Sequence, residues 1–255
     1  MNLIDTHTHI YLPEFDNDRD EVIERAVKNG VSRLLMPNID LESVERMHQA
    51  ATRYPDVCQM MIGLHPTSVG EDFEYQLDAL ERLSAKYDYK AIGEIGIDLF
   101  WDKTYFKEQV VAFKKQVAIA IGLGLPVVIH SRDSFPQVSE ALEEFKGQDL
   151  KGVFHAFTGT SDDARRAVEM GFMIGIGGIV TFKNSGLDKI VREVGLDNII
   201  LETDSPYLAP VPFRGKRNES SYLCLINNKI AGIFGVTPEE SASATYENSV
   251  TLFGL

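Results

Sequence analysis

Short apolar runs rich in β-branched residues alternate along the whole chain with longer segments that carry apolar residues at helical spacing. The short runs predict eight strands, at residues 3–9, 33–37, 59–65, 91–98, 126–130, 152–157, 172–177 and 199–204. The longer segments predict helices at residues 18–29, 41–54, 74–86, 105–122, 133–145, 161–170 and 186–194. Because strands that alternate with helices run parallel, this order predicts an α/β fold.

Eight strand–helix units in 255 residues favour a closed (β/α)8 barrel of the TIM type over an open doubly wound sheet. An open sheet that binds a dinucleotide carries a G-x-G-x-x-G turn after its first strand, and this chain has none there. The glycines of Gly175-Ile176-Gly177-Gly178 end the seventh predicted strand and are weak evidence for such a site. No linker, low-complexity tract or internal repeat divides the chain, so we expect one domain over residues 1–255.

The composition narrows the class of protein. A hydrophobic fraction of 44% supports a sizeable core, and no apolar run reaches the roughly 18 residues that span a bilayer. The first residues do not resemble a signal peptide, and Cys58 and Cys224 have no C-x-x-C spacing, so we expect a cytoplasmic protein with reduced thiols and no membrane partner. The net charge of −13 excludes a protein that coats long nucleic acid, but not an enzyme that draws one strand end into a metal site.

Histidines gather at one end of the predicted strands. Five of the six end a strand, namely His7, His9, His65, His130 and His155, whereas His48 lies on a helix and is expected to be exposed. A barrel brings the C-terminal ends of all its strands to one rim. Because side chains alternate along a strand, His7 and His9 point the same way and can hold the same divalent ion.

Two carboxylates complete the pattern. Glu94 lies in the fourth predicted strand with Gly93 and Gly96 beside it, and Asp204 ends the eighth. A carboxylate inside a barrel is costly unless it is paired or binds a metal. We therefore predict two ions that share Glu94, one held by His7, His9, Glu94 and Asp204 and the other by Glu94, His130 and His155. The alternative is a network of satisfied buried polar groups, which rarely gathers so many ionisable side chains.

Mixed imidazole and carboxylate ligands suit zinc, manganese, iron or cobalt and suit magnesium less well, so the pattern leaves the metal open among Mg, Mn and Zn. Two divalent ions against two ligand carboxylates leave a formal charge of about +2 in the pocket. That excess of positive charge suits a phosphate group.

Seven motifs together resemble the TatD family of metal-dependent deoxyribonucleases. They are Asp5-Thr6-His7-Thr8-His9, Gly63-Leu64-His65-Pro66, Gly93-Glu94-Ile95-Gly96-Ile97-Asp98, Ile129-His130-Ser131-Arg132, His155-Ala156-Phe157-Thr158-Gly159, Glu202-Thr203-Asp204-Ser205-Pro206-Tyr207-Leu208 and Arg214-Gly215-Lys216-Arg217-Asn218-Glu219. The D-x-H-x-H motif alone is shared with the wider amidohydrolase group. Ala156 replaces a frequent Cys and Ser220 a usual Pro, and neither is a ligand. Glu94 stands where some amidohydrolases use a carbamylated lysine, which favours the nuclease-like branch.

The resemblance implies an enzyme that trims single-stranded DNA from its 3′ end, and in some cases RNA, with divalent metal. It implies the same metal ligands, His7, His9, Glu94, His130, His155 and Asp204, and a role in DNA repair. The reaction would be phosphodiester hydrolysis by metal-activated water, with Glu94 and Asp204 as the catalytic carboxylates and Asp204 as the general base.

Further side chains complete the predicted site. His65 either donates to a substrate phosphate or helps hold an additional ion, unless it is a core histidine. Asp5 and Glu202 lie one layer deeper on their strands, where they support the ligands, although Glu202 can also be a ligand. Arg214, Lys216 and Arg217 form a basic loop that either reaches substrate phosphates or is merely solvated. Phe100 and the single tryptophan, Trp101, either stack on a terminal base or cap the barrel.

Other functions remain open on the same centre. One is a deacylase that removes D-amino acids from transfer RNA, and another is an amidohydrolase that acts on a small cyclic amide. A non-catalytic metal-binding protein would lack a ligand, and none is missing here. We expect the end of a nucleic acid strand as the partner and no obligate protein partner.

Overall fold

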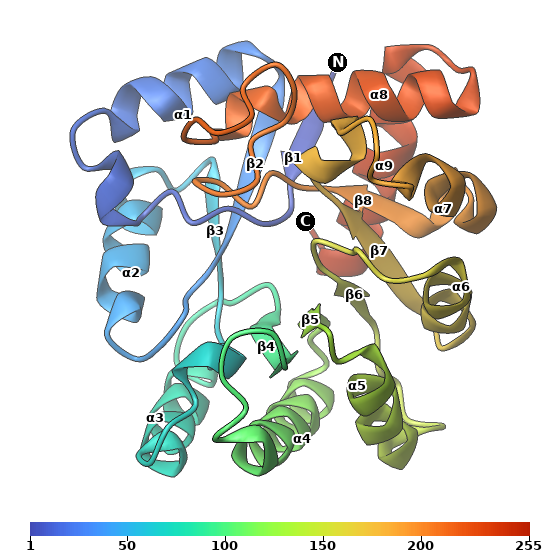
Figure 1. The fold of residues 1–255 in the computed structure, drawn as a ribbon. Coiled ribbons are helices and arrows are strands. Elements are labelled where there is room, and N and C mark those ends of the chain that lie inside the picture. The colour runs from blue at the N-terminus through green and yellow to red at the C-terminus, as the bar shows by residue number, and fades with distance from the viewer.

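The computed structural model describes residues 1–255 and contains eight parallel strands in a ring enclosed by helices (Figure 1). The strands are β1 (Leu3–Asp5), β2 (Val31–Pro37), β3 (Cys58–Met61), β4 (Ile92–Asp98), β5 (Val127–Arg132), β6 (Gly152–Phe154), β7 (Phe172–Ile176) and β8 (Ile199–Leu201). Hydrogen bonding groups them as β1-β2-β3 and β4-β5-β6-β7-β8.

Parallel bridges join these two groups at both seams, Thr8 with Ser205 and Ile62 with Ile92. Backbone hydrogen bonds support both seams, because Thr6 N donates to Leu201 O over 3.1 Å and Gly93 N donates to Ile62 O over 2.8 Å. The predicted (β/α)8 barrel is confirmed. Its description as one domain stays a prediction.

The seven predicted helices are present with ends shifted by a few residues. They are α1 (Arg19–Lys28), α2 (Ser43–Arg53), α3 (Phe73–Ser84), α4 (Phe106–Leu123), α5 (Phe135–Leu142), α6 (Ser161–Glu169) and α7 (Leu187–Val194). Thr160 caps α6 and exchanges hydrogen bonds with Asp163. No helix combines the length and the apolar character needed to cross a membrane.

Two C-terminal helices were not predicted, α8 (Leu223–Phe234) and α9 (Pro238–Phe253). The signal for α9 is local: Thr237 and Glu240 form a capping box around Pro238, which occupies the first helical turn. α8 is apolar over most of its length, which weakens the alternation of apolar and polar positions on which a helix prediction depends.

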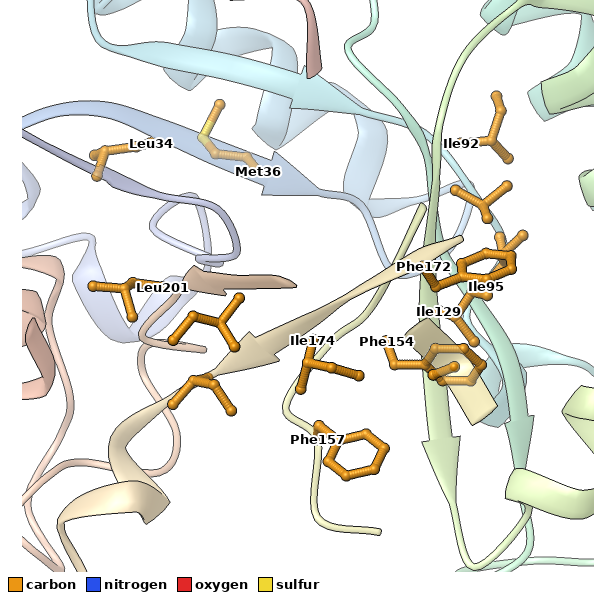
Figure 2. Close-up of a cluster of buried hydrophobic side chains, with 14 of the residues drawn as sticks. Leu34, Met36, Ile92, Ile95, Ile129, Phe154, Phe157, Phe172, Ile174 and Leu201 are labelled. Carbon is orange, nitrogen blue, oxygen red and sulfur yellow. The ribbon is translucent and has the colours of Figure 1, made fainter. Parts of the chain in front are cut away.

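A layer of buried apolar side chains joins the strands to the surrounding helices. It contains 52 residues, and Figure 2 shows part of it, including Phe154 of β6 and Phe172 and Ile174 of β7. Within it Phe154 and Phe172 meet edge to face, with ring centroids 5.5 Å apart. This layer fixes the strands against the helices and so holds the rim of the barrel in place.

A second apolar cluster fills the barrel on the side away from the rim. Its strand members include Ile4, Leu35, Val128, Val153 and Ile200, and the end of α9 adds Leu252 and Phe253. Figure 1 accordingly shows the C-terminus inside the ring of strands. α9 therefore supplies an apolar floor beneath the rim.

Several strands are shorter than predicted. β1 ends at Asp5, β3 at Met61, β6 at Phe154 and β8 at Leu201, so the candidate ligands beyond these ends lie in loops. The reason lies in the backbone pairing: beyond Asp5, for example, the chain meets its neighbours through single hydrogen bonds and an isolated bridge at Thr8, and not through a continuous ladder.

Candidate metal centre

The loops after β1, β3, β6 and β8 converge with β5 on the carboxylate of Glu94, which is buried in β4. Local packing requires a glycine close by: Gly96 has φ +154°, and an added Cβ there would lie 1.9 Å from His130 O. Only glycine permits this approach of β4 to β5. It brings His130 beside Glu94.

The two oxygens of Glu94 face different histidines. Oε2 lies 3.1 Å from His7 Nε2 and 4.0 Å from His9 Nε2. Oε1 lies 2.8 Å from His130 Nδ1, 3.2 Å from His155 Nε2 and 3.3 Å from His65 Nε2. All five strand-end histidines therefore surround one carboxylate, as their positions in the sequence predicted.

Asp204 closes the His7 side of the cluster. Its Oδ1 lies 3.6 Å from His9 Nε2 and 3.9 Å from His7 Nε2. His7 Nε2 and His9 Nε2 are themselves 3.3 Å apart, so the two rings point at one place as the alternation predicted. The Asp204 side chain is 14% exposed and Glu94 only 4%, so Asp204 is the more exposed of the two acids.

The turn that carries Asp204 is held from both sides. Asp204 has φ +57°, a left-handed conformation that is uncommon for a residue other than glycine. Its backbone N–H donates to His7 O over 2.9 Å. The amide of Asn218 donates to Thr203 O over 2.7 Å and to Tyr207 O over 2.6 Å. These bonds fix a turn that would otherwise relax.

Three groups of donor atoms are close enough to hold an ion. They are His7, His9 and Glu94; His7, His155 and Asp204; and His65, Glu94 and His130. The first contains three of the four ligands predicted for the first ion, whereas Asp204, the fourth, falls in the second group. In the second predicted set His130 was paired with His155, whereas the structure gathers His65 with His130 and brings His155 to His7 and Asp204.

Buried acids stand behind two of the histidines. Glu202 Oε1 lies 3.1 Å from His155 Nδ1, on the side of the ring away from Glu94. Gly175 leaves room for this acid, since an added Cβ would lie 2.7 Å from Glu202 Oε2. Asp98 Oδ2 lies 2.9 Å from His130 Nε2. Such contacts fix the orientation of a ring and make it a better ligand.

Asp5 supports the centre through the backbone. Its Oδ1 accepts from Thr203 N over 2.9 Å and from His7 N over 3.4 Å, and its Oδ2 accepts from Thr203 Oγ1 over 2.6 Å. It thereby joins the two segments that carry His7 and Asp204. Burial raises the pKa of Asp5 to about 7, although hydrogen bonds from Ser220 and Thr203 oppose this rise.

The electrostatics favour ionised acids among imidazoles. Burial alone would raise the pKa of Glu94, but the charges of the imidazoles around it, led by His155, hold that pKa well below its usual range. Burial also opposes ionisation of Asp204, yet the hydrogen bond from His9 and nearby imidazole charges lower its pKa. Burial lowers the pKa of His7 and His65, which favours the neutral form that binds metal.

The donor set fits divalent metal ions. Five imidazoles and two ionised carboxylates meet in one place. Ion pairs with the two acids cannot account for all five imidazoles. Imidazole and carboxylate together are the usual protein ligands of zinc, manganese, iron and cobalt.

The remaining predicted residues lie around this centre with different partners. Arg217 forms an ion pair with Asp18: its guanidinium donates to both carboxylate oxygens, over 2.8 and 2.6 Å. Arg214 and Lys216 are exposed and have no carboxylate partner, with Arg214 above the ring of Phe182. His48 is half buried against Tyr89 OH, 2.7 Å from its Nε2, and not exposed as expected.

Three contributors were missed by the sequence reasoning. Asp98 lies four positions after Glu94 in β4, so strand alternation alone was enough to place it on the same face. Tyr11 extends the His7, His9 alternation and has its OH 3.2 Å from His9 Nδ1. Asn218 had no such signal, because its role depends on how a loop folds.

Comparison with known proteins identifies the group. A family model described as "TatD related DNase" matches residues 4–254. The chain belongs to this family. A curated relative described as "Uncharacterized metal-dependent hydrolase YabD", from Bacillus subtilis, is 39% identical over 252 residues that cover 98% of each chain.

Two more relatives extend the TatD assignment. The "3'-5' ssDNA/RNA exonuclease TatD" of Pantoea vagans is 31% identical over 259 residues, 99% of this chain and 100% of that one. The crystal structure of YjjV, a TatD homologue from Escherichia coli, superposes with a TM-score of 0.93 at 28% identity and covers 99% of this chain and 98% of its own. This chain is thus a metal-dependent hydrolase of the TatD family, and clusters in its centre can hold metal ions.

Proposed function

We propose that this hydrolase cleaves phosphodiester bonds and removes nucleotides from the 3′ end of single-stranded DNA, with RNA also accepted. The observation that carries the proposal is the position of Glu94, whose two oxygens face separate groups of histidines. A bridging carboxylate of this kind suits a two-metal site that holds the attacking and leaving oxygens of a phosphoryl transfer. The name of the Pantoea relative supports the same substrate.

The proposed ligands are His7, His9, Glu94 and Asp204 for one ion and Glu94, His130 and His155 for the other, with His65 next to the second. When bound, such ions acidify water and neutralise the charge that develops on the phosphoryl oxygens. Against the two ligand carboxylates they leave a formal excess of about two positive charges. That charge favours a phosphate over a neutral amide.

The proton of the attacking water passes to the carboxylate of Asp204, the more exposed of the two acids. A new P–O bond forms to the water oxygen while the bond to the strand's 3′ oxygen breaks, and that oxygen leaves as a hydroxyl with a proton from solvent. Glu202 and Asp98 keep His155 and His130 oriented through this step. Arg214 and Lys216 supply the free positive charges of the β8 loop for substrate phosphates, and Arg217 anchors that loop to Asp18.

The test is cleavage of a single-stranded oligonucleotide labelled at its 5′ end, with a 3′-labelled copy beside it, in magnesium or manganese. We expect a ladder that shortens from the 3′ end and disappears with a chelator. Glu94→Gln, which keeps the shape and removes the charge, lowers the rate at least a hundredfold. Asp149→Asn changes a fully solvated acid and serves as the matched control.

Failure of the metal-loaded protein to shorten either oligonucleotide contradicts the proposal. The next substrates are then a D-aminoacyl-transfer RNA and a small cyclic amide, since the same centre suits both reactions.

A further inference from the structure

An exposed aromatic pair stands beside the metal centre and has no partner within the protein that covers it. Phe100 and Trp101 follow β4, and their side chains are 49% and 69% exposed. Their rings meet edge to face with centroids 4.9 Å apart. Trp101 is the single tryptophan of the chain, and its exposure is unusual for so large an apolar surface.

A cation lies against this pair. The guanidinium of Arg132 lies 3.9 Å from the centroid of Phe100 and 5.3 Å from that of Trp101. Arg132 is exposed and forms no ion pair, whereas Arg19, Arg25, Arg46 and Arg217 all pair with acids. An arginine with a free charge on aromatic rings suits a ligand that is both flat and anionic.

The position of the pair is tied to the metal centre through Asp98. One oxygen of Asp98 accepts from the backbone N–H of Phe100 over 2.9 Å and of Trp101 over 3.1 Å. The other lies 2.9 Å from Nε2 of His130. Arg132 is itself opposite Asp98 in the β4–β5 register, two residues after His130. The backbone of the aromatic pair is therefore joined to the candidate ligand His130 through one side chain, that of Asp98.

A groove passes beside Trp101. It is lined by residues 66–70 of the loop after β3, together with Trp101, Asp102, Tyr105 and Gln109. Pro66, the first of these residues, directly follows His65, whose Nε2 is 3.3 Å from Glu94 Oε1. The groove therefore lies beside the loop that carries one histidine of the centre.

We propose that Trp101, Phe100 and Arg132 bind one unpaired nucleobase and its phosphate next to the scissile bond, with the base stacked on Trp101 and the phosphate paired with Arg132. This inference rests on the proposed function, because it names the feature of a single strand that the site recognises. A duplex keeps its bases stacked on one another and offers none to the indole, so the site selects single strands.

Tryptophan emission gives a test that does not depend on cleavage, since every signal comes from Trp101. The metal-loaded protein is titrated with an oligonucleotide whose 3′ linkages are phosphorothioates, and with a copy whose last residues are abasic. We expect the first to quench the emission and the second to bind about tenfold more weakly without quenching. Equal Kd values, or no change in emission with either, would overturn the proposal.

Cleavage provides the second measurement. Trp101→Ala raises KM for the normal oligonucleotide about tenfold with kcat little changed, and Trp101→Phe restores most of the loss. On the abasic substrate Trp101→Ala and the unaltered protein behave alike, because the base that the indole would contact is missing. Tyr75→Ala, which removes a 65% exposed aromatic on α3, is the matched control.

The outcomes separate the two proposals. If the unaltered protein cleaves no oligonucleotide, and its emission is quenched by the base-bearing oligonucleotide and not by the abasic one, the result contradicts the nuclease proposal and supports the base-binding site. Normal cleavage by Trp101→Ala, together with no quenching of the unaltered protein, contradicts the site and leaves the nuclease standing. If the unaltered protein forms dimers at high concentration and Trp101→Ala does not, this surface binds a second copy of the chain. That result also overturns the proposal.

Discussion

Asn218 is distant in sequence from the turn at Asp204, yet its amide donates to backbone carbonyls on both sides of that acid. Its own Oδ1 accepts from the N–H of Glu219, so the side chain has one fixed orientation. Asp204 in turn has a left-handed backbone that needs such support. The proposed general base is therefore positioned by a buried residue that is not itself a candidate ligand.

Asn218→Asp is expected to lower kcat about 10- to 100-fold, because it keeps the shape and the acceptor but loses both donated bonds. Steady-state kinetics and a pH–rate profile measure the effect. The matched control is Asn248→Asp, which removes the same kind of bonds to Leu196 and Ile199 at the other end of β8. An equal loss of kcat in both variants would mean that Asn218 acts only through stability.

Asp5 makes stability depend on pH. Its pKa of about 7 in the folded protein lies above the value of about 3.9 in an unfolded chain, so the folded state binds the proton more tightly. The stabilisation is full below about pH 4 and is lost as the pH rises through 7, by at most about 1.4 kcal/mol per pH unit. Urea unfolding of the metal-free protein between pH 5 and 8 should show this loss, and Asp5→Asn should remove it. Identical pH dependence in both proteins would contradict the assignment.

At the level of elements, the strands and seven helices could be predicted because each carries its own apolar period. The ends of β1, β3, β6 and β8 could not, because strand length is set by pairing with neighbours and not by local sequence. The strand pattern placed Asp204 at the rim correctly. The conformation of its turn could not be predicted from the hydrophobic periodicity, because it depends on the side chain of Asn218. Likewise, the pattern could not predict that His130 is grouped with His65 and not with His155, because the conformations of the loops that carry these residues decide it.

α9 shows how an element remote from the rim supports it. Phe253→Ala is expected to lower the free energy of unfolding by about 3–5 kcal/mol, because the barrel interior around Ile4 and Val128 cannot collapse onto the space left. Thr251→Ala, on the exposed side of the same helix, should change it by less than about 0.5 kcal/mol. Denaturant unfolding measures both, and similar effects would show that α9 does not form the floor.

For the whole molecule, the net charge of −13 and the metal centre act in opposite directions on a nucleic acid. An acidic surface would repel a nucleic acid strand, and bound ions would supply the local positive charge. The predictions of a cytoplasmic location, a role in DNA repair and the absence of an obligate protein partner concern the cell and stay predictions.

Removal of metal should destabilise the entire fold, because the ligands come from most of the barrel, from His7 to Asp204. At a free metal concentration a hundred times Kd, binding stabilises the folded state by about 2.7 kcal/mol. Calorimetry should therefore show a Tm that falls with chelator and rises again with manganese or zinc. In Glu94→Gln the response to metal should be much smaller. A Tm indifferent to metal would contradict a centre that joins the strands.

The seam between β1 and β8 has a consequence for how the protein is made. His7 follows β1, the first strand in chain order, while Asp204, whose N–H donates to the His7 carbonyl, follows β8, the last. A nascent chain that has not reached β8 therefore exposes a pair of imidazoles that lack their final acid and the strand that covers them. The proposed ion beside them gains its full set of ligands only once β8 and the turn after it have been made.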